Sequence, residues 1–187
     1  MARDSIFAHG AVVVADFVTP AEEERILLRI GSAPWMTELR RRVQHYGYRY
    51  DYRGASRPEP AAPFPRWAAV MADRLREHFG GAPSVQCIVN EYRPGQGIGM
   101  HADHADFGPV VASLSLAADW PMRFRPRAVR PYARDGLPGD EVVVLPRRSV
   151  LVLAGAARSA WMHGIDRADT AGQAATRLSA TFRTLAR

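Results

Sequence analysis

The stretch His101-Ala102-Asp103 brings an imidazole and a carboxylate within two residues of each other. In an extended strand alternate side chains share a face, so both groups are expected to point the same way. Both are metal ligands, and His163 lies far enough along the chain for several strands to return it to the same place. One His-x-Asp can arise by chance, but the three residues together predict a metal site in a chain of returning strands.

A second stretch, Arg177-Leu178-Ser179-Ala180-Thr181-Phe182-Arg183, alternates polar and apolar side chains with a period of two. Arginine at both ends of one face predicts a strand that lines a polar cavity. The two arginine Cα atoms would lie about 20 Å apart, too far to hold one carboxylate together. They could hold the two ends of a short dicarboxylate, since guanidinium suits carboxylate recognition. A solvated edge strand would tolerate the same residues, but a metal site upstream favours an anion site.

The order of motifs resembles that of the AlkB-like dioxygenases, which use Fe(II), 2-oxoglutarate and O2. The matching motifs are Asn90-Glu91-Tyr92-Arg93-Pro94-Gly95, Ile98, His101-Ala102-Asp103, Ser113-Leu114-Ser115-Leu116, His163-Gly164-Ile165 and Arg177 through Arg183. The resemblance covers residues 85–185 closely and 38–60 more loosely. It implies an Fe(II)/2-oxoglutarate-dependent dioxygenase, and two histidines with one carboxylate suit Fe(II) in such enzymes.

The resemblance also implies roles for single residues. Arg177 would pair with the distal carboxylate of 2-oxoglutarate, and Arg183 would lie nearer the metal end. The catalytic iron would be held by His101, Asp103 and His163, and further contacts to the cosubstrate would come from Asn90, Tyr92 and Ser179.

The fold is predicted to be mainly β, of the α+β kind, in one domain over residues 1–187. Short strands are expected near 85–92, 110–116, 120–125, 140–145, 149–154, 160–165 and 177–184. Closely spaced strands with Gly, Pro and Asp turns are typical of a sandwich or jelly roll. The resemblance implies the double-stranded β-helix, with its core over 85–185. Two N-terminal helices should flank it, one opening with the capping box Thr19-Pro20-Ala21-Glu22 and one after Pro65.

Residues 38–66 interleave arginines with tyrosines, the chemistry of phosphate contact and base stacking. A hairpin with its tyrosines packed on the core is the alternative. In AlkB-like proteins the matching region is a lid over the active site. The expected substrate contacts are therefore Arg42, Gln44, Tyr46 and Tyr48, with Asp106, shortly after the His-x-Asp pair, as an acidic residue facing the base.

Composition limits the classes of protein. All 25 residues counted as Lys or Arg are arginines. The net charge of +6 weakly favours a polyanionic partner such as nucleic acid. Cys87 is the only cysteine, so no disulfide can form within the chain. No run of apolar residues is long enough to span a membrane. We expect a cytoplasmic protein, acting as a monomer.

The favoured reaction is oxidative demethylation of alkylated nucleic-acid bases, in which hydroxylation of an N-methyl group releases formaldehyde. A base inside a duplex is out of reach, so the substrate would be single-stranded or flipped out. One alternative is hydroxylation of a modified wobble uridine in tRNA, because Leu145-Pro146-Arg147-Arg148-Ser149 and the 42–48 segment look most like that AlkB branch. Others are a small-molecule or protein substrate, or a non-catalytic metal-binding module of the same fold, for which zinc would also fit the ligands.

Overall fold

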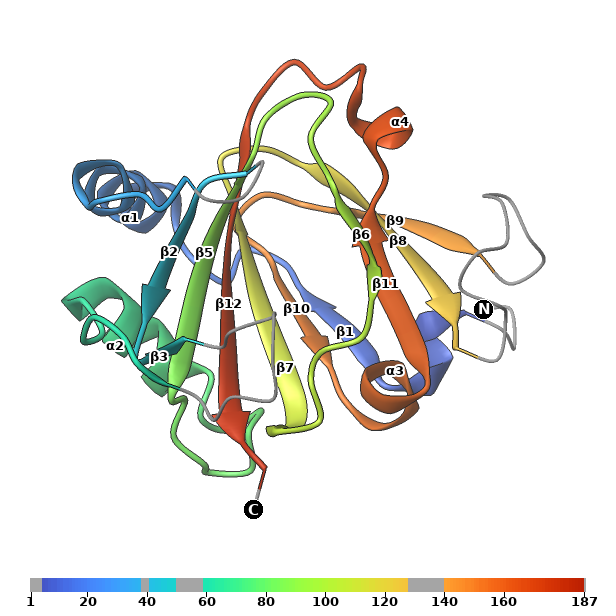
Figure 1. The fold of residues 1–187 in the computed structure, drawn as a ribbon, viewed down its shortest axis with the longest axis horizontal. Helices are drawn as coiled ribbons and strands as arrows, with labels where there is room; N and C mark the ends of the chain where they lie inside the picture. The colour runs from blue at the N-terminus through green and yellow to red at the C-terminus, as the bar shows by residue number, and fades with distance from the viewer. Residues whose placement is uncertain (1–4, 38–40, 50–58, 128–139, 187) are drawn as a thin grey trace.

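Two antiparallel β-sheets of unequal size form the framework of the chain in this computed structural model, which describes residues 5–37, 41–49, 59–127 and 140–186 (Figure 1). The six-stranded sheet has the order β1 (Ala11–Val14), β10 (Val150–Leu153), β7 (Phe107–Leu116), β12 (Arg177–Leu185), β5 (Gln86–Tyr92) and β2 (Val43–Tyr46). The four-stranded sheet has the order β6 (Ile98–His101), β11 (Trp161–Ile165), β8 (Trp120–Pro126) and β9 (Glu141–Leu145). The mainly β expectation is confirmed, and the strands lie close to the ranges predicted for them.

Strand β12 shows how the sequence pattern divides the large sheet into two faces. Leu178, Ala180 and Phe182 belong to, or pack against, an apolar cluster that includes side chains of the helices. The alternating polar residues of β12 line a cavity on the other face. The period-two pattern of this strand therefore separates a packing face from a polar face.

Helices α1 (Pro20–Ser32) and α2 (Arg66–Arg74) pack on the apolar face of the large sheet, at the left in Figure 1. Helix α1 begins with the predicted capping box: Thr19 accepts from the Glu22 amide, and Glu22 accepts from the Thr19 amide. Helix α2 follows Pro65 as predicted and ends at Arg74. Leu75 and Phe79 are buried in the turns that follow it.

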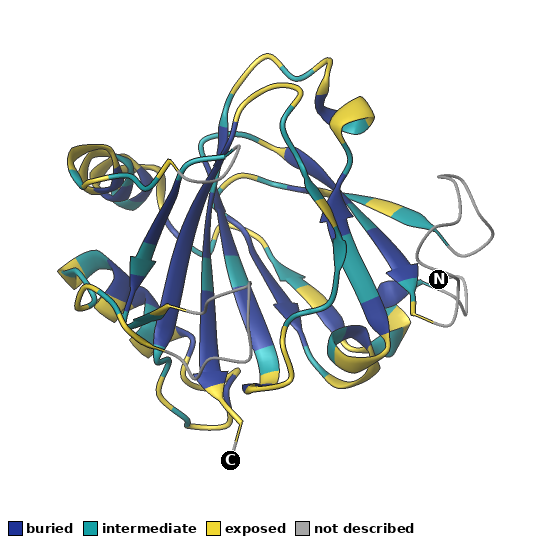
Figure 2. Cartoon of the chain, viewed as in Figure 1, coloured by how far each residue is buried: buried dark blue, intermediate teal, exposed yellow. Residues whose placement is uncertain are grey.

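A second apolar cluster fills part of the space between the two sheets. Its members include Tyr92 from the large sheet and Trp120, Phe124 and Trp161 from the small one. Figure 2 shows buried residues running along the strands of both sheets, while the outer turns of the helices are exposed. The rest of the space between the two sheets is occupied by the cavity that the polar face of β12 lines.

The remaining elements are short: η1 (Ile6–His9), β3 (Tyr48–Arg49), β4 (Glu59–Pro60), α3 (Gly155–Ser159) and α4 (Arg167–Thr170). The predicted lid at 38–66 falls partly at 38–40 and 50–58, outside the described residues. Within the described part of the chain, no helix is long and apolar enough to cross a membrane.

Candidate active site

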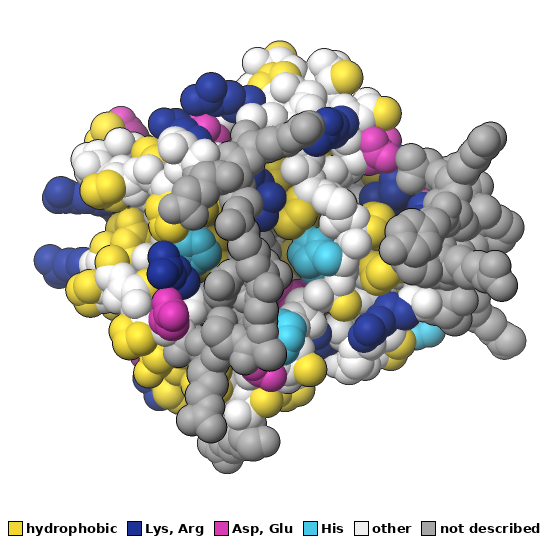
Figure 3. All heavy atoms as spheres, in the orientation of Figure 1, with side chains coloured by type: hydrophobic (Ala, Val, Ile, Leu, Met, Phe, Trp, Pro, Cys, Tyr) yellow, Lys and Arg dark blue, Asp and Glu magenta, His cyan; other side chains and the backbone are white. Residues whose placement is uncertain are grey.

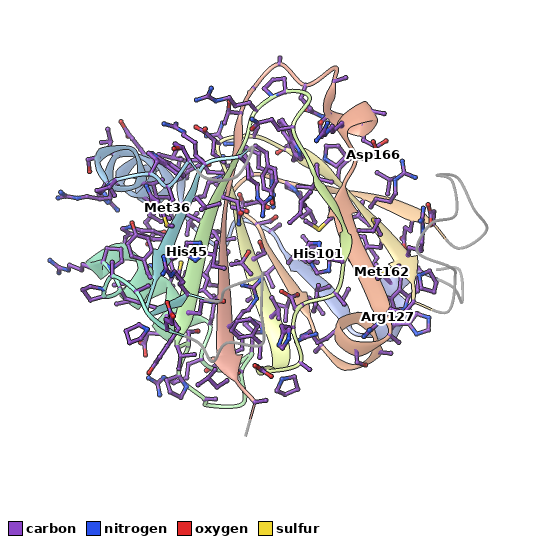
Figure 4. All side chains as sticks on the ribbon, viewed as in Figure 1. Met36, His45, His101, Arg127, Met162 and Asp166 are labelled. Carbon is purple, nitrogen blue, oxygen red and sulfur yellow. The ribbon has the colours of Figure 1, made fainter. Side chains whose placement is uncertain are left out.

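A cavity of about 540 Å³ opens between the two sheets, and both sheets contribute to its lining. The large sheet lines it from β2, β5, β7, β10 and β12, and the small sheet from β6, β8 and β11. Figure 3 shows histidine side chains surfacing near the middle of the face shown. Figure 4 labels His45 on β2 and His101 on β6, which line the cavity from opposite sheets.

Three of the predicted ligands lie together at the small-sheet side of this cavity. His101 and His163 face each other across the antiparallel pair β6–β11, with ring centroids 4.5 Å apart. Asp103 follows β6 instead of continuing it, so the strand expected through both His101 and Asp103 ends at His101. Its carboxylate still reaches the pair, with Oδ2 lying 3.8 Å from His163 Nε2.

Asp103 is held ionised by a cation from the large sheet. Arg183 donates from Nε and Nη2 to Asp103 Oδ1 at 2.8 and 2.6 Å. Burial opposes ionisation, but Arg183 and the two histidines together hold the pKa of Asp103 far below its usual range. Oδ2 of the same carboxylate is buried and has no hydrogen-bond partner among the described residues. A buried carboxylate oxygen without a donor is costly, and a bound cation would satisfy it.

The two histidines are prepared to act as neutral ligands. His101 Nδ1 lies 2.9 Å from the carbonyl of Gly99, which can only accept, so this nitrogen carries the proton and Nε2 is left with its lone pair. Burial, together with the nearby His101, lowers the pKa of His163 to about 4. Within the described residues no three such side chains are already arranged as a complete metal site. The donor set nevertheless fits Fe(II) in type, charge and protonation.

Arg177 places a buried positive charge in the lining of the same cavity, from the large sheet. Its side chain is 1% exposed, and Nη2 donates to Ser115 Oγ at 2.8 Å. The guanidinium lies 5.8 Å from the centroid of the Tyr92 ring, and Nε has no partner among the described residues. Burial lowers the pKa of Arg177 to about 10. No described carboxylate forms an ion pair with this cation, so the site is suited to an anion that enters the cavity.

The other predicted cosubstrate residues also line the cavity. Asn90 and Ser179 are directly opposite each other on β5 and β12, and Tyr92 is opposite Arg177 on the same pair of strands. Asn90 Oδ1 accepts from Arg41 Nε at 2.9 Å. Arg183 also lines the cavity, but its donors are used by Asp103 and by Gln86 Oε1 at 2.8 Å.

Two predicted substrate residues, Gln44 and Tyr46, lie on the face of β2 that packs against the helices and not on the face that lines the cavity. Gln44 donates to the carbonyl of Ile30 in α1 at 2.8 Å, and the Tyr46 hydroxyl donates to Gln44 Oε1 at 2.9 Å. Both are buried on the helix side of the strand. Sequence alternation separates two faces of a strand but does not say which one meets the cavity, and here both faces are covered.

The remaining predicted substrate contacts also lie outside the cavity lining. Arg42 forms a bidentate pair with Glu91, through Nη2–Oε1 at 2.6 Å and Nε–Oε2 at 2.7 Å. Tyr48 lies on the short strand β3, and Asp106 is exposed beside His104, with Oδ1 and Nδ1 3.5 Å apart. None of these three side chains lines the cavity.

Two residues that line the cavity were not predicted, because the sequence prediction chose the alternate residues, Gln44 and Tyr46, on the opposite face of β2. Arg41 and His45 line the cavity from the side of β2 that carries Val43. Arg158 of α3 was also missed, and it donates to the backbone carbonyls of Asp103 at 3.1 Å and His104 at 2.8 Å. A lone arginine in an alanine-rich segment gives no sequence signal for that role.

Comparison with known proteins identifies the family to which this arrangement belongs. The model of the 2OG-Fe(II) oxygenase superfamily matches residues 10–183. The chain belongs to that superfamily. This match and the relatives described below confirm two predictions: the chain is AlkB-like, and its activity class is that of a 2-oxoglutarate-dependent dioxygenase. Such oxygenases use Fe(II), 2-oxoglutarate and O2, which is the set that the cavity chemistry fits.

Several relatives carry AlkB-type names. "Alkylated DNA repair protein ALKBH8 homolog" of Arabidopsis thaliana is 34% identical over 174 residues, covering 83% of this chain and 50% of its own length. "tRNA (carboxymethyluridine(34)-5-O)-methyltransferase alkbh8" of Xenopus tropicalis is 35% identical over 171 residues, covering 83% of this chain and 25% of its own length. The chain therefore spans half of one relative and a quarter of the other.

The fold is shared with solved structures at lower sequence identity. "The structure of OsALKBH1" matches with a TM-score of 0.67 and 20% identity, covering 94% of this chain and 98% of that one. Agreement over nearly the whole of both chains shows a common fold.

Proposed function

We propose that His101, Asp103 and His163 hold Fe(II), and that Arg177 receives the distal carboxylate of 2-oxoglutarate. The observation that carries the proposal is Arg177, a buried guanidinium with no described carboxylate partner, in the cavity lined also by the three metal donors. The unpaired Asp103 Oδ2 supports the metal half. When bound, Fe(II) with 2-oxoglutarate and O2 supplies the oxidation of a substrate C–H bond, with release of succinate and CO2.

The protein residues act by binding and positioning. Arg183 keeps Asp103 ionised and fixes its Oδ1, so that only Oδ2 remains for a ligand. Arg158 holds the backbone after β6, which keeps Asp103 beside His163. Asn90, Tyr92 and Ser179 contribute polar groups around the cosubstrate, and the apolar wall with Met122, Leu151 and Leu153 limits water.

We propose a nucleic-acid base as the substrate, with oxidative demethylation of an alkylated base as the leading reaction. Arg41 and His45 belong to the predicted lid segment and line the cavity, so they could contact a base that has left its stack. A second candidate is hydroxylation of a modified wobble uridine in tRNA. The name of the Xenopus tropicalis relative favours this candidate, since it concerns carboxymethyluridine in tRNA.

The finer architecture is part of the same proposal. We propose that the two sheets form a double-stranded β-helix, that residues 1–187 act as one domain, and that 38–66 is its lid. We further propose a cytoplasmic monomer, for which gel filtration of the purified chain is the first check.

The test is succinate release from 2-oxoglutarate with Fe(II), ascorbate and oligonucleotides that contain 1-methyladenine, 3-methylcytosine or a modified uridine. Formaldehyde that matches succinate with a methylated base supports demethylation. Succinate with a hydroxylated uridine supports the second candidate. His101→Ala is the blank, and turnover that survives it would count against the iron site.

If succinate is released but no oligonucleotide increases its release, the oxygenase activity is supported and the nucleic-acid substrate is rejected, in favour of a small molecule or a protein. Iron or zinc binding without any turnover would instead favour a metal-binding module.

A further inference from the structure

The groove between α1 and α2 lies on the face of the large sheet opposite the active-site cavity, and it has a volume of about 670 Å³. Its floor is apolar and includes Tyr46, Trp67 and Val70, of which Val70 is 44% exposed. The Tyr46 and Trp67 rings meet edge to face, with centroids 6.4 Å apart. An aromatic floor held in place by a second ring offers a surface on which a planar group can stack.

The rim of this groove is positively charged. Arg25 and Arg29 come from α1 and Arg66 from the start of α2, and all three are exposed. None of the three forms an ion pair with a described residue. Glu22, the one acid among the described lining residues, is paired with Arg74. The groove therefore combines three exposed arginines that have no ion-pair partner among the described residues with a floor in which Val70 is exposed, Trp67 is partly exposed and Tyr46 is buried.

Strand β2 connects this groove to the cavity. It is the last strand of the large sheet, and its alternate side chains serve both sites: Val43 and His45 line the cavity, and Tyr46 lines the groove. The outer edge of β2 is covered by short pairings with Met36 and Ala62, so a ligand that contacts both sites must pass over these segments. The groove alone is on the wrong face to hold the group that reacts.

We propose that the α1–α2 groove binds the sugar-phosphate backbone and an unstacked base of an RNA strand whose reacting nucleotide lies in the cavity. Arginines at the rim match phosphates, and the Trp67 floor matches a base face. This inference rests on the proposed nucleic-acid substrate and adds a second contact surface to it. The groove acts through affinity for long strands, while the chemistry stays in the cavity.

The test is binding of a fluorescein-labelled single-stranded RNA of about 16 nucleotides, measured over a range of salt concentrations. The groove variant is Arg25→Gln/Arg29→Gln/Arg66→Gln. The control is Arg93→Gln/Arg127→Gln/Arg167→Gln, which removes the same charge from exposed positions away from the groove; Arg127 is labelled at the opposite side of the molecule in Figure 4.

We expect the groove variant to bind at least about tenfold more weakly, with the slope of log Kd against log salt reduced by about 2, since each lost phosphate contact removes about 0.7. The control should change neither by as much. Equal losses in the two variants would overturn the proposal, since net charge alone would then explain binding. Groove-dependent binding of poly-glutamate without binding of RNA would also overturn it, in favour of an acidic protein partner.

Trp67→Phe gives a second readout that does not depend on charge. RNA should quench the fluorescence of the wild-type protein, and most of this quenching should disappear in the variant, which keeps an aromatic ring in the floor. Unchanged quenching would place the RNA elsewhere. Thermal unfolding of each variant checks that the fold is retained.

Turnover separates this inference from the proposed function. With a long RNA substrate the groove variant should raise KM at unchanged kcat, and with a substrate of one to three nucleotides it should match the wild type. Turnover of long RNA that the groove variant leaves unchanged would reject the proposed role of the groove and keep the proposed substrate. RNA binding through the groove without turnover of any nucleic acid would reject the proposed substrate and keep the groove as a binding site.

Discussion

At the scale of single residues, the decisive feature is Arg177, a buried cation that has no carboxylate partner among the described residues. Arg177 and Arg125 are both buried, at 1% and 2% exposure, but only Arg125 has a carboxylate, with Nε–Oδ1 and Nη2–Oδ2 distances to Asp140 of 2.6 and 2.7 Å. Removal of one member of a buried pair typically costs about 3–5 kcal/mol, because the other charge is left uncompensated. Removal of an unpaired buried charge carries no such penalty.

We therefore predict opposite results for two matched variants. Arg177→Met should leave the free energy of unfolding unchanged or raise it, and should abolish the increase in Tm that 2-oxoglutarate causes. Arg125→Met should lower the free energy of unfolding by about 3 kcal/mol, the lower end of that range because Arg123 Nη1 remains 3.6 Å from Asp140 Oδ2, and should keep that increase. Differential scanning calorimetry with and without 2-oxoglutarate measures both effects. Equal destabilisation by the two changes would mean that Arg177 serves stability instead of ligand binding.

The sequence predicts some of these residues and misses others for one physical reason. On β12 the two faces differ in polarity, so the pattern alone separates Arg177 and Arg183 from Phe182. On β2 Gln44 is polar but faces the helices, because its amide donates to backbone carbonyls at the end of α1. Polarity marks a hydrogen-bonding requirement, and a buried helix end can meet it as well as a cavity.

At the scale of elements, the spacing of β6 and β11 sets the distance between the two histidines. Gly164 follows His163, and a Cβ at this position would lie 2.9 Å from both the Ile98 carbonyl oxygen and Met100 Sδ. Gly99, on the facing strand, has nothing within 4 Å of the same added atom. One glycine is thus needed for the close approach of the strands, and the other is not.

We predict that Gly164→Ala separates β6 from β11 and lowers metal affinity, with a loss of about a hundredfold in turnover from misplaced ligands. Gly99→Ala should behave like the wild type in both respects. Titration of each apo protein with Mn(II), followed by electron paramagnetic resonance, measures affinity independently of turnover. Wild-type affinity in Gly164→Ala would show that the strands adapt without moving the histidines.

The contact between α1 and α2 gives a pH-dependent prediction. The Arg74 guanidinium, with the Thr19 amide, lowers the pKa of Glu22 from 4.5 to about 2, although the pair lies at the surface of the molecule. A carboxyl group with a lowered pKa in the folded state stabilises the protein above its unfolded pKa, and that contribution is lost as the pH falls through the folded value. The window for Glu22 is therefore pH 4.5 to about 2.

Glu22→Gln keeps a capping-box residue at this position but removes the charge. We predict that it lowers the free energy of unfolding by about 1 kcal/mol at neutral pH, since Arg74 is partly exposed and solvent weakens the pair. The difference from the wild type should shrink as the pH falls from 4.5 to about 2. Urea unfolding at a series of pH values provides the comparison. A difference that is independent of pH would assign the effect to packing.

At the scale of the whole molecule, the sequence could predict the strands, the two helices and the order of motifs, because each depends on local pattern. It could not predict which strands form which sheet. That assignment brings β12, near the end of the chain, between β7 and β5, and so puts Arg183 against Asp103 from the other sheet. Such a contact depends on the packing of two sheets, for which a single sequence carries no direct signal.

The same division between sheets predicts how ligands stabilise the molecule. The metal donors belong to the small-sheet side, and Arg177 and Asn90 belong to the large sheet. A metal alone would tie together only β6 and β11, whereas a cosubstrate that bridges the metal and Arg177 would connect both sheets. Binding that orders a shared region gives cooperativity, because the second ligand meets a site that is already fixed.

We therefore predict that Mn(II) and 2-oxoglutarate together raise Tm by more than the sum of their separate effects. Hydrogen exchange should slow in β6 and β11 with Mn(II) alone, and in β12 only when both ligands are present. In Arg177→Met the effect of Mn(II) should remain, and 2-oxoglutarate should add nothing. Additive shifts in the wild type would mean that the two ligands bind without connecting the sheets, and the cavity would then hold them as independent sites.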